Sequence, residues 1–559
     1  MYTEDNQLYI AHCDNGPLYM VGKMANRHGL IAGATGTGKT VTLQVLAESF
    51  CEAGVPCFMA DMKGDLSGIS QPGKLSSFIE KRKDGLGIPN PEFKACPVRF
   101  YDVFGEQGFP MRTTVSAMGP QLLSRLMGLS DVQSGVLNIV FHIADDKQLL
   151  LIDLKDLRLM LDFVGQNTSL FTTVYGNISP ASIGAIQRAV LAIQSEGGDK
   201  FFGEPAFNVE DLIDMEDGMG VMSVLAADKL MLNPKLYSTY LLWLITELYA
   251  KLPEVGDLDL PKFVFFFDEA HMLFDGTSKA LVDKIEQVIR LIRSKGVGIY
   301  FITQVPADVP VNVLAQLSNR VQHALRAYTP QDQKAVRAAA QTFRPNPSFK
   351  TDEAILDLAT GEALVSFLDE KGAPSVVERA KILFPLSQIG AITPGQRFDI
   401  QAAAPANLKE YEKSFDRESA YEVLTEAYQK AEEEKEKEIK AAEKEKERQA
   451  KEKEKQSKKS SSKKGGIGRT ILGTMIAAAA TSFARSAGTN IAKKIGGGTT
   501  RKSTSTTKKS SSSTKKGTST TKKSSSGSIL GDSVKKATKS AVNTTARKVT
   551  TEILKGLFK

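Results

Sequence analysis

The sequence predicts an α/β fold with a mainly parallel sheet, and three observations support this prediction. Short runs of consecutive apolar residues recur along the first 400 residues, amphipathic segments separate them, and a glycine-rich loop stands between the first apolar run and the first amphipathic segment. Strands that are apolar on both faces are typical of a parallel sheet covered by helices. The chain has 559 residues, 42% of them hydrophobic, and can therefore bury a sizeable core.

The predicted strands and helices alternate from the start of the chain. The spacing of apolar residues predicts strands at 28–32, 55–60, 220–225, 263–267, 297–303, 321–325 and 363–368, and helices at 40–53, 235–252 and 278–294. Between about residues 117 and 215, apolar residues recur every three or four positions. This part is expected to form a helical insertion between two strands.

The composition changes after residue 405. Residues 406–456 are rich in Ala, Glu, Lys and Gln, and their mixed charge favours a long solvated helix held by i,i+4 pairs. Residues 457–559 carry Ser/Thr/Lys repeats that cannot bury a core, so a disordered tail is expected. Two basic amphipathic islands, 465–498 and 527–559, interrupt this low-complexity tail.

Charge and cysteine usage indicate the partners and the compartment. Residues 1–400 hold 46 acidic and 36 basic side chains, whereas residues 401–559 hold 18 acidic and 36 basic ones, so the two parts face different partners. The four cysteines show no C-x-x-C pair and no zinc spacing, which favours free thiols in a reducing compartment. The N-terminus lacks the features of a signal peptide, and no apolar stretch reaches the roughly 18 residues that span a bilayer. A cytoplasmic protein is expected.

A phosphate-binding loop is predicted between the first strand and the first helix. The motif G-x-x-x-x-G-K-[ST] is matched by Gly33, Ala34, Thr35, Gly36, Thr37, Gly38, Lys39 and Thr40. The glycines let backbone N–H groups turn toward phosphates, and Lys39 reaches the β- and γ-phosphates. The Thr40 hydroxyl can ligate Mg²⁺. The sequence therefore predicts a nucleotide site made by these eight residues.

Other predicted strands end in acidic or amide side chains. The strand 263–267 ends in Asp268 and Glu269. We expect Asp268 to hold Mg²⁺ and Glu269 to polarise the attacking water. Gln304 follows the next predicted strand and can hydrogen-bond the γ-phosphate or that water. Asp61 is expected at the same edge of the sheet. For Gln304 a strand-end cap, and for Asp61 a turn cap, stays an open alternative.

Together these motifs resemble the HerA/FtsK group of P-loop ATPases, and most closely its bacterial HerA-like branch of helicase-type proteins. The resemblance covers about residues 5–400 and rests on Gly33–Thr40, Asp61–Asp65, Phe263–His271 and Thr303–Pro306. It implies a RecA-like core over residues 1–405 that hydrolyses ATP with Mg²⁺. It also implies a ring, usually a hexamer, around DNA or another polymer.

The resemblance also implies an arginine finger, and in HerA proteins it would imply a nuclease partner. In a ring, an arginine from the neighbouring subunit can stabilise charge on the transferred phosphoryl group. Arg320 and Arg326 are the candidates, with Arg293 third. HerA proteins carry an N-terminal β-barrel that helps to engage a nuclease. Only 32 residues precede Gly33, too few for that barrel, so the nuclease partner is not supported.

Two functions from different classes fit these features. The first is a ring-forming DNA translocase or helicase-like motor. The second is a regulatory or scaffolding NTPase that switches assembly or docks a protein partner. Glu269 favours the motor, because a pure switch needs no strong hydrolytic carboxylate. The basic tail fits contact with nucleic acid, an anionic membrane surface or a protein partner, and also fits a solubilising appendage.

Overall fold

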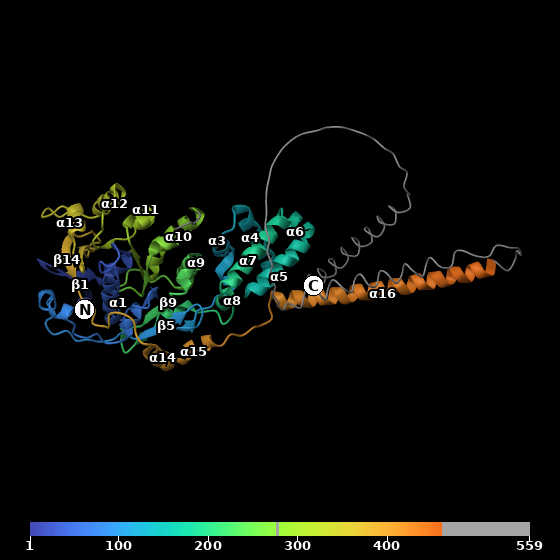
Figure 1. Ribbon diagram of the computed structural model, residues 1–559, viewed down its shortest axis with the longest axis horizontal. Helices are drawn as coiled ribbons and strands as arrows, with labels where there is room; N and C mark the ends of the chain where they lie inside the picture. The colour runs from blue at the N-terminus through green and yellow to red at the C-terminus, as the bar shows by residue number, and fades with distance from the viewer. Residues whose placement is uncertain (275–278, 461–559) are drawn as a thin grey trace, which may run out of the picture. The chain divides into compact units, whose positions relative to one another are not determined.

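The computed structural model describes residues 1–274 and 279–460 (Figure 1). Its contacts divide the chain into two compact units, Met1–Ala427 and Tyr428–Lys559. The predicted islands 465–498 and 527–559 lie outside the described residues. Within the described ranges, no helix is both long and apolar enough to cross a membrane.

A twelve-stranded sheet forms the centre of the first unit, in the order β2-β1-β14-β13-β12-β3-β11-β10-β4-β9-β5-β6. Neighbouring strands from β12 to β6 are parallel. They are β3 (Gly29–Ala32), β4 (Cys57–Asp61), β5 (Val98–Asp102), β6 (Phe109–Pro110), β9 (Met222–Ala226), β10 (Phe263–Phe267), β11 (Val297–Thr303) and β12 (Asn319–Gln322). Every residue of β3, β4, β10 and β11 is buried, which explains why their sequences are continuous apolar runs.

The sheet continues past β12 with antiparallel strands: β1 (Gln7–Cys13), β2 (Gly16–Val21), β13 (Glu362–Ser366) and β14 (Glu378–Ile382). Only β13 was predicted from the sequence. In β14 exposed positions alternate with less exposed ones, so this strand has no continuous apolar run, and in β2 only Met20 is buried. A two-stranded hairpin, β7 (Met215–Glu216) and β8 (Met219–Gly220), is separate from the main sheet.

Helices accompany the strands of the sheet. They are α1 (Lys39–Glu52), α2 (Ser77–Glu80), α9 (Pro234–Lys251), α10 (Lys279–Ile292), α11 (Val311–Leu314), α12 (Pro330–Ala340) and α13 (Thr351–Asp357). Three of them, α1, α9 and α10, correspond to the predicted helices at 40–53, 235–252 and 278–294. Phe50 of α1 lies 5.9 Å, ring centre to ring centre, from Tyr300 of β11, and Phe266 of β10 lies 5.4 Å from the same ring. This aromatic cluster fixes α1 on the parallel half of the sheet.

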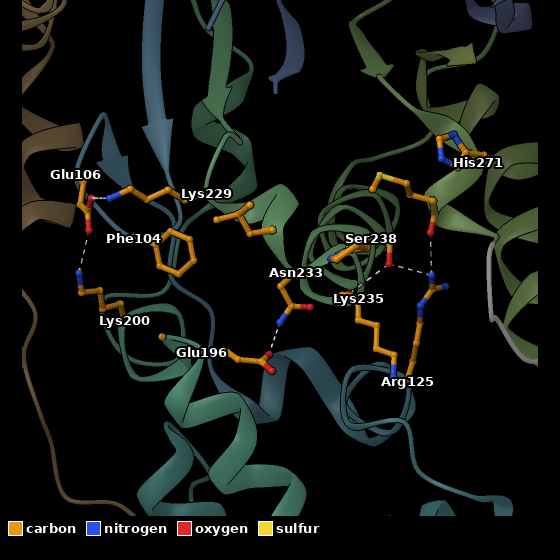
Figure 2. A pocket seen from close by; sticks show the side chains of 14 residues that line it. Phe104, Glu106, Arg125, Glu196, Lys200, Lys229, Asn233, Lys235, Ser238 and His271 are labelled. Atoms are coloured by element: carbon orange, nitrogen blue, oxygen red, sulfur yellow. Dashed lines mark hydrogen bonds and ion pairs between the residues drawn. The ribbon is translucent and has the colours of Figure 1, made fainter. Parts of the chain in front are cut away.

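A group of helices lies between β6 and β9 in the chain. It comprises α3 (Val115–Met127), α4 (Asp131–Asp146), α5 (Leu154–Gln166), α6 (Thr168–Tyr175), α7 (Pro180–Ser195) and α8 (Gly198–Phe201). The side chains of Thr114, Ser130, Asp153 and Ser179 cap the starts of four of them. Arg125 of α3 donates a hydrogen bond of 2.9 Å to Ser238 Oγ of α9, which ties the group to the sheet domain (Figure 2).

The chain after β14 returns across the domain through α14 (Pro394–Ala403), α15 (Ala406–Lys409) and the start of α16 (Ala420–Ser460). The guanidinium of Arg397 lies 4.2 Å from the ring centre of Phe100, and Arg112 Nη1 donates to the carbonyl oxygen of Tyr411 at 2.7 Å. Because these contacts continue along the segment, the compact unit extends past the boundary expected at residue 405 and reaches Ala427.

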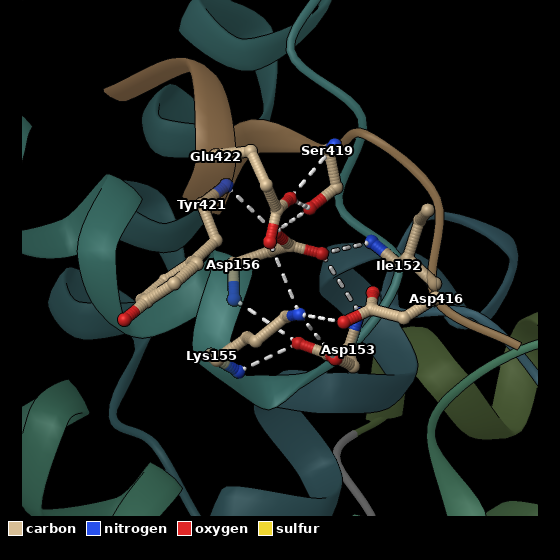
Figure 3. A network of polar contacts seen from close by, with 8 residues as sticks. All are labelled: Ile152, Asp153, Lys155, Asp156, Asp416, Ser419, Tyr421 and Glu422. Atoms are coloured by element: carbon tan, nitrogen blue, oxygen red, sulfur yellow. Dashed lines mark hydrogen bonds and ion pairs between the residues drawn. The ribbon is translucent and has the colours of Figure 1, made fainter. Parts of the chain in front are cut away.

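A buried carboxylate joins this returning segment to the helical group (Figure 3). The Asp156 side chain is fully buried. Its Oδ2 accepts hydrogen bonds from the backbone of Ile152 at 2.8 Å and Asp153 at 3.1 Å, and its Oδ1 accepts from Ser419 Oγ at 2.5 Å and the Tyr421 backbone at 2.8 Å. Four donors therefore neutralise one desolvated carboxylate and connect α5 to the start of α16.

Replacing the Asp156 carboxylate should detach the start of α16. In Asp156→Asn the amide N–H₂ faces at least one backbone N–H in either orientation, and a backbone N–H can only donate, so we expect the free energy of unfolding to fall by about 1–3 kcal/mol. We also expect faster tryptic cleavage after Arg417. Denaturant titration and limited proteolysis measure both effects.

Asp416→Asn is the matched control, because the Asp416 side chain is 60% exposed and, among the described residues, pairs only with Lys155. An exposed pair of this kind contributes about 0–1 kcal/mol. Equal effects of the two substitutions would contradict a special role of the Asp156 network.

Candidate active site

The predicted site groups follow strands that are neighbours in the sheet. The order β3-β11-β10-β4 is parallel throughout, so the carboxyl ends of these strands meet at one edge. The glycine loop follows β3, Gln304 follows β11, Asp268 follows β10, and Asp61 ends β4. The structure thus brings together residues from four distant parts of the chain, at the edge where α/β folds bind ligands.

The glycine loop has the backbone geometry that a phosphate cradle needs. Gly36 and Gly38 have φ of 77° and 116°, values that side-chain-bearing residues rarely adopt. Their N–H groups have no hydrogen-bond acceptor within the described parts of the chain. The loop is attached to the sheet through Ala34, whose N–H donates to the Ala324 carbonyl at 2.9 Å. The free amides can therefore bind phosphate oxygens.

His323 supports the loop from behind, and no sequence motif marks it. Its Nδ1 lies 3.0 Å from the Glu362 carbonyl oxygen and its Nε2 lies 2.8 Å from Thr42 Oγ1. Because a carbonyl can only accept, Nδ1 carries the proton and Nε2 accepts from Thr42. A Cβ added at Gly33 would lie 2.5 Å from the His323 Cβ, so this glycine permits the close approach. Burial lowers the pKa of His323 to about 4.

Lys39 begins α1 and points back over the loop. Its Nζ donates to the carbonyl oxygens of Gly33 at 2.7 Å and Ala34 at 3.2 Å. Burial lowers the pKa of Lys39, whereas the charges of Glu269 and Asp268 raise it, so the ammonium group lies within electrostatic range of both carboxylates. Phosphate oxygens of a nucleotide would compete with the two carbonyls for the same ammonium group.

Asp268 and Glu269 stand directly after β10. Burial, together with the neighbouring Glu269 charge, raises the pKa of Asp268 to about 6, although a hydrogen bond from the Glu269 backbone and the charge of Lys39 lower it. Tyr237 fixes the strand end, because its hydroxyl donates to the Asp268 carbonyl oxygen at 3.0 Å. Oxygen ligands such as the Asp268 carboxylate and the exposed Thr40 hydroxyl suit Mg²⁺.

Glu269 has an unusual backbone and an unsatisfied oxygen. Its φ and ψ of 46° and 50° place it in the left-handed region, which is strained for a glutamate. Its Oε2 is buried, accepts no hydrogen bond among the described residues and lies 3.4 Å from His271 Nδ1. A buried carboxylate oxygen without a donor is suited to accept from a water molecule.

Gln304 and Asp61 flank these groups. Gln304 is exposed at the end of β11, between β3 and β10. Asp61 Oδ2 accepts from the Ser67 backbone at 3.0 Å, and burial raises the pKa of Asp61 to about 6. Its Oδ1 is buried and has no partner in the described ranges. Asp61 therefore caps a turn through Oδ2, while its Oδ1 accepts no hydrogen bond from a described residue.

The predicted arginines have different surroundings. The guanidinium of Arg320, in β12, donates hydrogen bonds of 2.9–3.1 Å to the carbonyl oxygens of Leu314, Leu317 and Thr342. Arg326 is exposed shortly after β12 and makes no hydrogen bond or ion pair to a described residue. Arg293 precedes β11, at the opposite edge of the sheet from the glycine loop. Of these three, only Arg326 combines proximity to the loop edge with an uncommitted side chain.

The strand–loop–helix unit, with carboxylates on the strand two positions along the sheet, defines the class of P-loop NTPases. Residues 6–503 match the family described as Helicase HerA-like C-terminal, and the chain belongs to this family. The fold class expected from the sequence, a mainly parallel α/β P-loop core of RecA-like type, is thereby confirmed. A comparison with curated proteins gave no match.

Several solved structures are similar to this chain. The unbound bacterial conjugative coupling protein TrwBdeltaN70 has a TM-score of 0.46 at 15% identity, over 70% of this chain and 92% of that one. TrwB in complex with ADP and Mg²⁺ has a TM-score of 0.44 at 14% identity, over 66% and 88%. VirB4 of Thermoanaerobacter pseudethanolicus has a TM-score of 0.44 at 12% identity, over 71% and 99%.

Protonation of His323 should loosen both the fold and the loop. The folded-state pKa of about 4 lies below the ordinary histidine value of 6.5, so the unfolded chain binds the proton first as the pH falls. The contribution of His323 to stability, about 3 kcal/mol at most, is complete above pH 6.5 and lost toward pH 4. His323→Asn should remove this part of the pH dependence, measured by denaturant titrations from pH 7 to pH 4.

His28→Asn provides the matched control. Burial lowers the pKa of His28 to about 4 as well, but this residue precedes β3 at the other edge of the sheet. Both variants should lose pH dependence of stability, whereas only His323→Asn should weaken nucleotide binding. Equal nucleotide affinity in the two variants would remove His323 from the site.

Proposed function

We propose that the chain is a Mg²⁺-dependent ATPase that works as a ring-forming, helicase-like motor or translocase on DNA. The observation that carries the proposal is the buried, unsatisfied oxygen of Glu269, which stands at the same sheet edge as the glycine loop and Lys39. A site that only binds a nucleotide needs no such carboxylate. A site that hydrolyses the nucleotide needs one to orient the attacking water.

The residues divide the chemistry among them. The amides of Gly36 and Gly38 and the Lys39 ammonium bind the β- and γ-phosphates and offset their charge. The Thr40 hydroxyl and the Asp268 carboxylate hold Mg²⁺, which supplies further charge neutralisation when bound. Glu269 accepts a hydrogen bond from the attacking water and orients it toward the γ-phosphate.

Gln304 is placed to sense the γ-phosphate. It follows β11, the strand between the glycine loop and Asp268. The turn after it is held by Asp308, whose Oδ2 accepts from Thr303 Oγ1 at 3.0 Å and from the Val305 backbone at 3.1 Å. A hydrogen bond from the Gln304 amide to the γ-phosphate or the water would thus report the nucleotide state to this turn.

The proposal of a ring, of DNA as the polymer and of a cytoplasmic location goes beyond the family assignment. In HerA-like proteins the site is completed by a neighbouring subunit, and the exposed Arg326 is our finger candidate because its side chain is uncommitted. DNA is chosen as the polymer because the matched family is named for a helicase. The four cysteines are buried free thiols, which fits the reducing cytoplasm.

Substitutions at the loop and at β10 should separate binding from hydrolysis. Lys39→Ala should abolish ATP binding and turnover, whereas Glu269→Gln should keep binding and lower kcat by about 10²–10⁴-fold, the usual effect of losing a general base. Glu370→Gln, on an exposed loop, is the control and should change neither. Turnover is measured with Mg²⁺ alone and with duplex DNA, single-stranded DNA or RNA.

The DNA part of the proposal depends on stimulation of this turnover. Wild-type activity that is indifferent to every nucleic acid would contradict the motor and favour the NTPase that docks a protein partner. Unaltered turnover in Glu269→Gln would instead remove Glu269 from the mechanism.

Arg326 and Arg320 should behave differently when each is replaced by alanine. Arg326→Ala should leave the free energy of unfolding within about 0.5 kcal/mol and lower kcat by about 10³-fold or more. Arg320→Ala should destabilise the subunit by about 1–3 kcal/mol, because buried carbonyl oxygens lose their donors.

Mixing subunits tests whether Arg326 acts across an interface. Arg326→Ala and Glu269→Gln subunits should each be nearly inactive alone. Mixed rings should regain part of the turnover, since some interfaces then contain both wild-type residues. Unchanged kcat in Arg326→Ala would move the assignment to Arg293.

A further inference from the structure

A second cavity lies beside the candidate active site. It has a volume of about 1000 Å³ and is lined by residues that follow β5, β9 and β10 and by residues of the helical group (Figure 2). This volume is at the upper end of the range of about 300–1000 Å³ in which small ligands and cofactors bind. Two lining residues, His271 and Met272, belong to the 3-10 helix η6 (Ala270–Leu273), which begins directly after Glu269.

Basic side chains from separate segments converge on this cavity. Lys200 comes from α8, Lys229 from the turn after β9, and Lys235 from α9. Lys200 and Lys229 share one carboxylate, Glu106, with a separation of 3.2 Å for the Lys200 pair. Lys235 is exposed, and its ammonium group makes no hydrogen bond or ion pair within the described chain. The three ammonium groups therefore exceed the acidic charge that pairs with them.

An aromatic ring lies among these charges. Phe104, on the loop after β5, is half-buried and lines the cavity next to Glu106. Figure 2 shows its ring between the Lys229 side chain and Glu196. Glu196 accepts a hydrogen bond from the side-chain amide of Asn233 and keeps its negative charge, so the cavity wall carries two carboxylates, Glu106 and Glu196, against the basic side chains of Arg125, Lys200, Lys229 and Lys235. The open face of the ring and the neighbouring ammonium groups are the two elements that bind an unpaired base and its phosphates.

We propose that this cavity binds a single strand of nucleic acid, with a base stacked on Phe104 and phosphates paired with Lys200, Lys229 and Lys235. The proposal rests on the proposed function and specifies the form of the polymer that the motor holds. Free nucleotides offer the same chemistry, and the experiment below distinguishes them from a strand.

The cavity shares a wall with the hydrolytic segment. Arg125 of α3 donates to the carbonyl oxygens of Met272 at 3.3 Å and Leu273 at 2.9 Å. Both carbonyls belong to η6, so the helical group holds the segment that positions Glu269. A strand bound between this group and the sheet edge touches η6 and stabilises one arrangement of Glu269. Strand binding is therefore expected to change ATP turnover.

Stimulation of the full-length protein tests the site. The variant Phe104→Ala/Lys235→Gln should keep basal ATP turnover, since neither residue belongs to the nucleotide site. The concentration of an oligothymidylate of about 30 nucleotides that gives half-maximal stimulation should rise about tenfold, because one stacked base and one phosphate contact are lost. Lys23→Gln/Lys371→Gln, which alters two exposed lysines elsewhere, should respond like wild type.

Two further measurements distinguish an error in the strand site from an error in the proposed function. Thymidine monophosphate should not stimulate, and stimulation by it would show a nucleotide site instead of a strand site. Stimulation by duplex alone, or an unchanged response of Phe104→Ala/Lys235→Gln, would overturn the strand site and leave the DNA motor intact. Indifference of the wild type to every nucleic acid would overturn both.

Photo-crosslinking locates the strand directly on the full chain. An oligonucleotide carrying 5-iodouracil should crosslink to the peptide that contains Phe104, as identified by mass spectrometry. Crosslinks confined to residues after 460 would place the strand on the basic tail and overturn the cavity site.

Discussion

The parallel arrangement of β3, β11, β10 and β4 is the constraint on which the site depends. These strands are buried along their whole length, so neither their order nor their register can change without exposing the core. Their carboxyl ends must then meet at one edge. The glycine loop, Asp268 and Gln304 need no direct contact with one another, because each is placed by the strand that precedes it.

The edge is supported from both sides by segments that carry no part of the motif. His323, after β12, fixes the back of the glycine loop through Thr42 and the Glu362 carbonyl. Arg125, from the helical group, fixes η6 behind Glu269. Both side chains act on backbone or on a helix side chain, so they set positions and bring no chemistry of their own. The reacting groups are thus held by two regions that can respond to different partners.

The buried strands and the glycine loop could be predicted because their signal is local. Continuous apolar runs mark strands such as 263–267, and eight consecutive residues form the loop. The strand β5 contains Arg99, which interrupts its apolar run and pairs with Glu216, so it was missed. His323 and Arg125 could not be found because their partners are distant in sequence and several are backbone carbonyls, which every residue has.

The Asp156 network has a mechanical meaning for the end of the chain. The start of α16 is attached at α5, within the helical group, through the Asp156 carboxylate. A load carried by the residues that follow α16 therefore enters the folded domain at the helical group. That group holds η6 through Arg125, so tension on the end of the chain would reach the segment that follows Glu269 along one path of force.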